Sequence, residues 1–130
     1  MQVSDYMSPA PVTIEPGADY KQAFSVMQEK NLHHLPVLDS SNAVVGIVAR
    51  RDLQVAAQHF HEAPVEVGEV MHTPVTTIAS SEPLASAVER MSDQGIGCLP
   101  VTEDGGQQLV GIITEIDMLR ALKELLANQG

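Results

Sequence analysis

The sequence has 130 residues, of which 44% are hydrophobic and 18% are charged, and this balance predicts a compact globular fold rather than disorder. A formal net charge of −10 lacks the cationic footprint that nucleic-acid binding requires, so we expect no nucleic-acid partner. Cys98 is the only cysteine, which excludes an intramolecular disulfide and a multi-cysteine metal site.

In chain order, the first half of the sequence predicts an extended segment, a helix, two strands and a second helix. The extended segment covers residues 12–14 and is followed by turn formers and then by apolar residues at helical spacing. Two strands are predicted over 35–38 and 44–48, separated by a turn rich in Asp, Ser and Asn. The second helix is predicted to begin near Arg51.

The second half predicts the same elements in the same order. An extended segment at 76–78 precedes an amphipathic helix, and strands are predicted over 99–102 and 109–113. A last helix is predicted to begin near Glu115. This order of strand, helix, strand, strand and helix indicates the α/β (α+β) class, in two β-α-β-β-α repeats.

The two halves are copies of one unit. Met7 recurs as Met71, and Asp52 recurs as Asp117. Between them further landmarks recur in order, with one inserted residue: Thr13-Ile14, Ala23, Met27, Leu35-Pro36-Val37 and Val45-Gly46-Ile47. Such ordered self-similarity is the signature of an internal duplication.

The duplication predicts the organisation of the chain. We assign a first repeat to residues 1–61, a joining segment to 62–66 and a second repeat to 67–130. Because either half alone would bury too little apolar surface, we expect the repeats to pack sheet to sheet about a pseudo-two-fold axis.

The pattern Val-x-x-x-Met, Thr-Ile, Ala-x-x-x-Met, Leu-Pro-Val and Val-Gly-Ile-x-x-x-x-Asp, found twice, resembles the CBS domain. The chain is similar to a tandem CBS pair, or Bateman module, over nearly its whole length. The resemblance implies a ligand sensor that binds AMP, ADP, ATP or S-adenosylmethionine in clefts built from both repeats. It also implies a homodimer.

The resemblance implies that the first cleft is the stronger of two. Asp117 would accept the ribose hydroxyls, for which a carboxylate is suited, and Thr114 would lie near the ribose and phosphate. Basic residues at a helix start suit phosphate groups. The implied ligand-binding residues are Pro11, Val12, His33, His34, Arg50, Arg51, Ile112, Thr114 and Asp117.

The second cleft is expected to be weaker. It would use Ile47, Asp52, Val75 and Thr76. Ala49 stands where the second repeat has Thr114, so a hydroxyl is lost, and its partner positions bring no positive charge.

These residues also have plainer roles. Thr114-x-x-Asp117 is a helix N-cap of the capping-box type, and capping and ligand binding can coexist. The Arg50-Arg51 pair can be a solvated helix start, and one of the two histidines His33 and His34 can be only packed. The other histidines lack metal-ligand spacing, so we expect no metal and no cofactor other than an adenine nucleotide as regulatory ligand.

We predict a regulatory sensor and not an enzyme, because the phosphate-cradling, nucleophile-elbow and zinc-protease motifs are missing from the sequence. It would act in trans on an unidentified protein target. The alternative is a ligand-independent dimerisation or protein-interaction module with degenerate clefts. Without a signal-peptide pattern or an apolar run long enough to span a bilayer, we expect a cytoplasmic protein without membrane insertion.

Overall fold

The computed structural model describes residues 1–60 and 64–129 and has a mixed α+β fold. It divides into two compact units, Val12–Val75 and a second unit made of Met1–Pro11 with Thr76–Gly130. Within the described residues, none of the helices has the length and apolarity that crossing a membrane requires.

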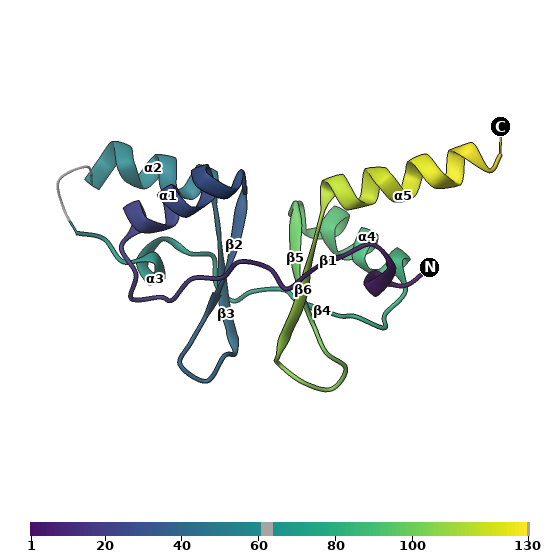
Figure 1. Cartoon of the computed structure of the whole chain (residues 1–130), viewed down its shortest axis with the longest axis horizontal. Helices are drawn as coiled ribbons and strands as arrows, with labels where there is room; N and C mark the ends of the chain where they lie inside the picture. Colours follow the sequence, from purple (N-terminus) through teal and green to yellow (C-terminus); the bar gives the residue numbers. More distant parts are fainter. Residues whose placement is uncertain (61–63, 130) are drawn as a thin grey trace. The chain divides into compact units, whose positions relative to one another are not determined.

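The unit Val12–Val75 is built on an antiparallel hairpin of β2 (His34–Leu38) and β3 (Val44–Ala49). Ile14 adds a single parallel bridge to Val37. Helices α1 (Tyr20–Lys30) and α2 (Arg50–Phe60) lie on the same face of this hairpin (Figure 1). A short helix, α3 (Val67–Val70), follows in the same unit.

Local signals explain the bounds of α1. The Asp19 side chain accepts a hydrogen bond from the backbone N–H of Lys21 at 2.7 Å, as a helix N-cap does. The helix ends at Asn31, which has a left-handed backbone with φ of 54°. Its inward face buries Tyr20, Ala23 and Met27 in the core of the unit.

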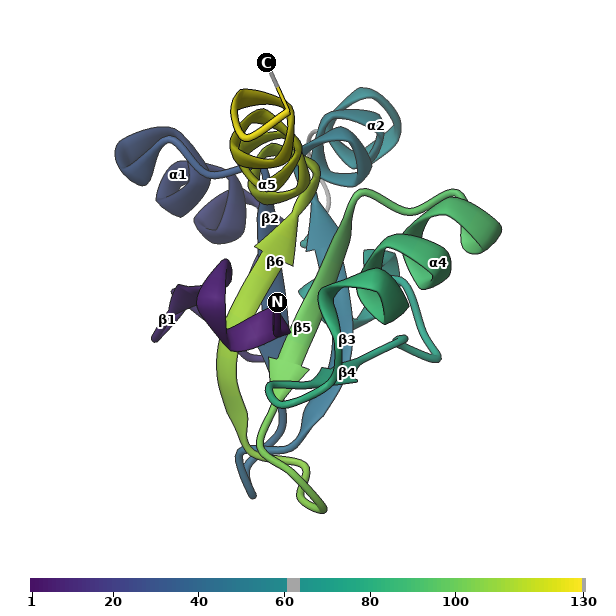
Figure 2. The same ribbon diagram turned by 90° about the vertical axis from the view of Figure 1, so that its right-hand side faces the viewer.

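The other unit carries a four-stranded sheet in the order β1-β6-β5-β4. The strands are β1 (Ser8–Pro9), β4 (Ile78–Ala79), β5 (Cys98–Thr102) and β6 (Leu109–Thr114), and the helices are η1 (Val3–Asp5), α4 (Leu84–Gln94) and α5 (Glu115–Ala127). β4 is parallel to β5, whereas the β5–β6 and β6–β1 pairs are antiparallel. Figure 2 looks onto this unit and shows α5 continuing directly from β6.

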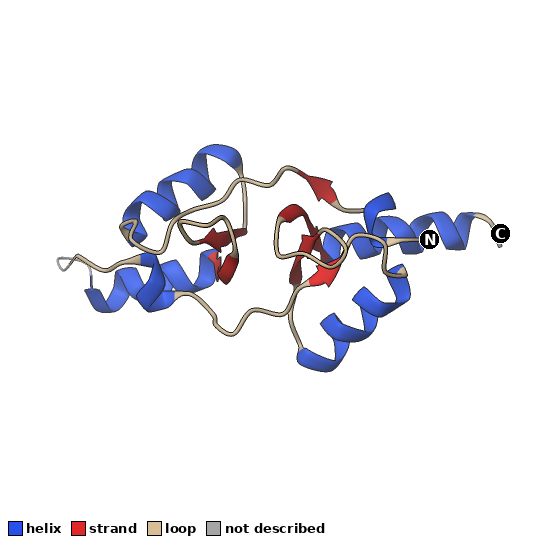
Figure 3. Ribbon diagram, turned by 90° about the horizontal axis from the view of Figure 1, so that it is seen from below, coloured by secondary structure: helices blue, strands red, loops and turns tan. Residues whose placement is uncertain are grey.

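The two helices of this unit, α4 and α5, also lie on one face of their sheet, as the view in Figure 3 shows. Beneath them a core is formed by Val3, Ile78, Leu99, Val101 and Ile113, each at most 1% exposed. Each unit is therefore a hairpin-centred sheet covered by helices on one side.

The predicted fold class is confirmed, with small shifts of the element bounds. The second helix of the first repeat begins at Arg50, one residue before the predicted start, and that of the second repeat begins at Glu115. The extended segments are shorter than predicted: the first contributes only the bridge at Ile14, and the second becomes β4.

The compact units do not coincide with the sequence repeats. The segment that opens the first repeat pairs with β6 of the second, with Ser8 opposite Ile112. In return, His72 from the second repeat makes an antiparallel bridge to Ile47 of the first. Each repeat thus supplies its opening segment to the unit that contains the other repeat's hairpin.

The joining segment predicted at 62–66 lies partly outside the described residues. Its described part includes Val65, which is 8% exposed and belongs to the core of its unit. The Val65 carbonyl accepts a hydrogen bond from the backbone N–H of Tyr20 at 2.9 Å, at the start of α1.

Candidate functional site

The start of α5 places a carboxylate against the end of β6. Asp117 Oδ2 accepts hydrogen bonds from the backbone N–H of Thr114 at 2.8 Å and from the Thr114 hydroxyl at 3.3 Å. Since strand and helix are joined without a loop, the carboxylate of the first helical turn reaches back to the last strand residue. The capping role that the sequence predicted for Thr114 and Asp117 is confirmed.

The start of α2 repeats this geometry without the hydroxyl. Asp52 Oδ2 accepts a hydrogen bond from the backbone N–H of Ala49 at 2.9 Å. As the sequence indicated, Ala49 provides no side-chain donor. The two equivalent carboxylates therefore have different sets of donors.

Each carboxylate also contacts a basic side chain that sequence reasoning missed. Asp117 Oδ1 forms an ion pair with the guanidinium of Arg120, one turn later on α5. Asp52 Oδ1 lies 3.0 Å from Nε2 of His72. The i, i+3 spacing of Asp117 and Arg120 was a usable signal for the first pair. No local sequence pattern predicts the contact of Asp52 with His72, because the bridge between His72 and Ile47 brings in a segment that is distant in sequence.

Strand alternation places a further predicted residue on the same strand face as the residue that donates to each carboxylate. In β6, Ile112 and Thr114 are half-buried and alternate with the buried Gly111 and Ile113, so they share one face of the strand. In β3, Ile47 is half-buried two residues before Ala49 and lies on the corresponding face.

Arg50, predicted to face phosphate, has its guanidinium engaged within its own unit. Nη2 donates to the backbone carbonyls of Met27 at 3.1 Å and Leu32 at 2.8 Å, at the end of α1. Carbonyls at a helix C-terminus lack helical partners and carry partial negative charge, so a guanidinium stabilises them. Its neighbour Arg51 is exposed on the first turn of α2.

The two predicted histidines differ in environment. His33 is exposed, and its backbone carbonyl accepts a hydrogen bond from the N–H of Arg50 at 2.8 Å. His34 is half-buried and pairs with Ala49 as the first residue of β2. The structure therefore brings these histidines next to the start of α2 in one unit.

The remaining predicted residues lie where the chain passes from one unit to the other. Pro11 and Val12 are half-buried neighbours that belong to different units, and so are Val75 and Thr76. The Thr76 hydroxyl donates to Gln94 Oε1 at 2.7 Å. The residues predicted for the two clefts are thus divided between the two units.

Metal-ligating side chains and the thiol of Cys98 are the other groups that could form a site. In the described part of the chain, no group of three or more His, Cys, Asp or Glu side chains is arranged to hold a metal ion. Cys98 is 5% exposed, and burial, assisted by the charge of Asp117, raises the pKa of its thiol far above the usual range. The thiol therefore stays protonated and unreactive at neutral pH.

Comparison with known proteins agrees with this arrangement of two equivalent halves. A family model described as "CBS domain" matches residues 3–58 and 67–124. The solved structure of the AcuB protein from Vibrio cholerae is similar, with a TM-score of 0.88 and 33% identity, covering 99% of this chain and 96% of that one. The CBS domain pair of protein MJ0100, in complex with 5′-methylthioadenosine and S-adenosyl-L-methionine, has a TM-score of 0.85 and 27% identity, covering 95% and 97%.

Curated relatives include larger proteins. Homoserine O-acetyltransferase from Methanohalobium evestigatum is 32% identical over 122 residues, which are 94% of this chain and 24% of that protein. The chain spans 15% to 24% of the length of the first curated relatives it matches.

Proposed function

The chain belongs to the CBS-domain family as a tandem pair of CBS repeats, and from this premise we propose that it is a regulatory sensor of an adenosine-containing ligand. The ligand would be AMP, ADP, ATP or S-adenosylmethionine, bound in a cleft to which both repeats contribute. Binding would shift the arrangement of the repeats and thereby modulate a protein partner, which requires different ligand affinity in the two arrangements.

The observation that carries the proposal is the carboxylate held at each helix start. Asp117 and Asp52 are both oriented by a backbone N–H at the end of the preceding strand. An oriented carboxylate suits the two hydroxyl donors of a ribose. The MJ0100 pair, 27% identical to this chain, is named as a complex with two ribose-containing adenosyl compounds.

The proposed phosphate side lies at the start of α2. Arg51 and His33 are exposed there, and a helix N-terminus favours an anion. We leave Arg50 out of the direct contacts, since a phosphate would have to break its two hydrogen bonds to the end of α1. The base would lie against Pro11 and Val12, and Ile112 would lie beside the ribose. His34 would lie next to the phosphate-binding residues.

The two clefts are proposed to be unequal. The cleft that contains Asp117 has the hydroxyl of Thr114 as a donor. The cleft that contains Asp52 has Ala49 at that position and lacks the hydroxyl. Its other proposed residues are Ile47, Val75 and Thr76. We therefore assign the adenosyl ligand to the cleft of Asp117.

Matched substitutions test this assignment. Asp117→Asn and Asp52→Asn each remove one charge while keeping shape, and their dissociation constants for AMP, ATP and S-adenosylmethionine are measured by titration calorimetry. We expect Asp117→Asn to weaken the preferred ligand at least roughly tenfold, since a carboxylate loses about 1.5 to 3 kcal/mol with its charged hydrogen bonds. Asp52→Asn should change it far less. Equal losses from both variants would refute the unequal clefts.

A second candidate function rests on the surface of α5. This helix exposes large apolar side chains, between 45% and 64% exposed: Ile116, Leu119, Leu122, Leu125 and Leu126. Such a face favours contact with another protein surface, so a homodimer or a ligand-independent interaction module is the alternative. A stable dimer in sedimentation together with no stabilisation by any adenosyl ligand would favour it over the sensor.

A further inference from the structure

The carboxylate of Asp117 is almost closed to solvent, although the basic side chain paired with it is not. The side chain of Asp117 is 4% exposed, and that of Arg120 is 60% exposed. The equivalent carboxylate of the first repeat, Asp52, is 21% exposed beside His72. Arg120 therefore lies between a buried acceptor and solvent.

The donors around Asp117 leave little room for a ribose. A carboxylate offers about four lone-pair sites. Two donors from Thr114 already point at Oδ2, and the guanidinium of Arg120 occupies Oδ1. A ribose diol brings two more donors, so one present donor must leave. The backbone N–H of Thr114 cannot leave without breaking the start of α5. The Thr114 hydroxyl can rotate away, but the carboxylate would then still be covered by Arg120. Displacement of the exposed Arg120 side chain both frees an acceptor site and uncovers the carboxylate.

Arg120 has another acceptor within reach on its own helix. Glu124 follows it by four residues, a spacing at which opposite charges on a helix meet. Glu124 Oε2 already accepts a hydrogen bond from the Tyr6 hydroxyl at 2.5 Å. The other contact of Arg120, to the Tyr6 carbonyl at 3.5 Å, is at the limit of a hydrogen bond and would not hold it.

We propose that Arg120 is a displaceable cover on Asp117, which the ribose of the ligand must remove before it can bind. This inference rests on the function proposed above and adds a residue that lowers affinity in the ligand-free state. It applies to the second repeat alone, since the position equivalent to Arg120 in the first repeat is Val55. The cover makes the site selective for ligands that present a full ribose diol, because only two new hydrogen bonds offset the lost ion pair.

Adenosine is the direct probe, because it presents the diol without a phosphate. Arg120→Met keeps the length of the side chain and removes its charge and donors. We expect it to lower the dissociation constant of adenosine roughly fivefold, since an ion pair with a solvent-exposed cation is a weak one. Lys123→Met is the matched control: it removes the same charge from an exposed residue of α5 and should leave adenosine affinity unchanged.

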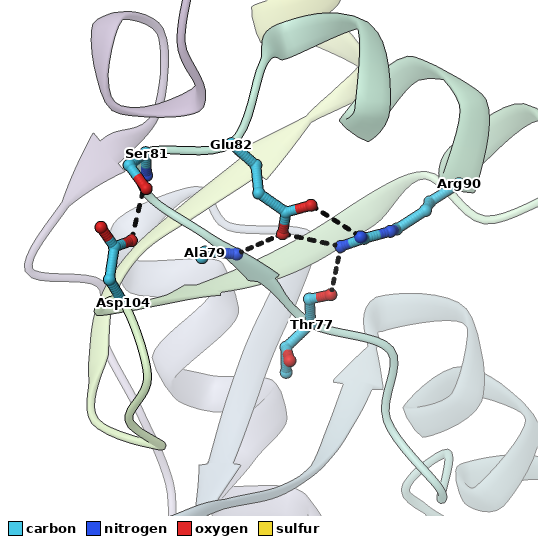
Figure 4. Close-up of polar contacts among 6 residues, drawn as sticks. All are labelled: Thr77, Ala79, Ser81, Glu82, Arg90 and Asp104. Carbon is cyan, nitrogen blue, oxygen red and sulfur yellow. Dashed lines mark hydrogen bonds and ion pairs between the residues drawn. The ribbon is translucent and has the colours of Figure 1, made fainter.

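A second readout follows the guanidinium itself. The chain has four arginines, Arg50, Arg51, Arg90 and Arg120, so only four side-chain ¹⁵Nε signals have to be assigned. Saturation with adenosine should move the Arg120 signal and leave that of Arg90 in place. Arg90 is the internal reference because both of its terminal nitrogens are bound to Glu82, at 3.1 and 2.8 Å (Figure 4).

The outcomes separate the cover from the sensor. Tighter adenosine binding by Arg120→Met, with a moving Arg120 signal in the wild type, supports the cover. Unchanged adenosine affinity in Arg120→Met overturns the cover. If that variant also binds AMP more weakly, Arg120 contacts the phosphate instead. If neither wild type nor Arg120→Met binds adenosine, AMP, ATP or S-adenosylmethionine, the sensor function fails and the cover with it.

Discussion

Asp52 and Asp117 occupy the same position in the repeat, yet their surroundings differ atom by atom. One carboxylate receives a backbone N–H and a histidine, and the other receives a backbone N–H, a hydroxyl and a guanidinium. Because a carboxylate has a limited number of acceptor sites, these neighbours decide how much of it is left for a ligand. The two aspartates are therefore equivalent in sequence position but differ in their hydrogen-bond partners.

Glu82 shows the same dependence on neighbours. Its carboxylate accepts a hydrogen bond from the backbone N–H of Ala79 at 3.0 Å and is held by Arg90 (Figure 4). The Ala79 N–H first, and then Arg90, lowers the pKa of Glu82 below its usual 4.5. A carboxyl with a lowered folded pKa stabilises the fold above its unfolded pKa, and this contribution is lost as the pH falls through the folded pKa.

We therefore predict that Glu82→Gln reduces the free energy of unfolding at pH 7 by about 0.5 to 1 kcal/mol, a figure held low because the side chain is partly exposed. At pH 3, which is below the usual carboxyl pKa of 4.5, part of this contribution should be lost, so the difference should shrink. Urea denaturation at both pH values measures it. Glu89→Gln, on the exposed side of α4, serves as control. An equal loss at both pH values would show that charge plays no part.

At the scale of elements, close packing of a methionine on a glycine joins an opening segment to each hairpin. A Cβ on Gly111 would lie 2.5 Å from Met7 Sδ, and one on Gly46 would lie 2.4 Å from Met71 Sδ. These distances are far below van der Waals contact, so only glycine lets the segment approach. The contacts explain why the same Gly recurs in both β3 and β6.

Gly111→Ala should destabilise the protein by about 2 kcal/mol, as overpacking in a close-packed interior does. The new Cβ would also lie 2.9 Å from the backbone oxygen of Ser8, which cannot move as a flexible side chain can. Chemical denaturation measures the loss. Gly17→Ala, where nothing lies within 4 Å, is the control. If both variants lost the same free energy of unfolding, the close approach of Met7 and Ser8 to Gly111 would not contribute to stability.

For the whole molecule, the exchange of opening segments makes the stability of each unit depend on residues from both repeats. Val3 is fully buried in the unit that contains the second repeat's hairpin. Its backbone N–H donates to the Glu82 carbonyl at 3.0 Å, and that of Leu84 donates to the Met1 carbonyl at 2.9 Å. The first residues of the chain thus stabilise elements that lie far along the sequence.

Deletion of residues 1–9 should therefore weaken the unit to which they belong and spare the other. Losing Val3 alone removes a fully buried side chain, worth roughly 1.5 to 3 kcal/mol. Hydrogen exchange of the backbone amides should become faster in β5 and β6 and stay slow in β2 and β3. Equal acceleration in both sheets would contradict the division of the chain into Val12–Val75 and the rest.

Local patterns in the chain were enough to predict the duplication, the order of elements, the two hairpins and the capping of α5 by Asp117. Each of these depends on neighbours in sequence: side-chain periodicity, turn-forming residues and hydrogen bonds within a helical turn. The ion pair of Asp117 with Arg120 was within reach of the same argument.

The partners of Arg50 and of Asp52, and the place of the opening segments, required the tertiary structure. Arg50 binds carbonyls at the end of α1, and His72 reaches Asp52 through its bridge to Ile47. These contacts join segments that only packing brings together, and no periodicity along the chain encodes them. The sequence by itself therefore determined the elements and the candidate side chains. The exchange of segments between repeats determined which of those side chains are in contact.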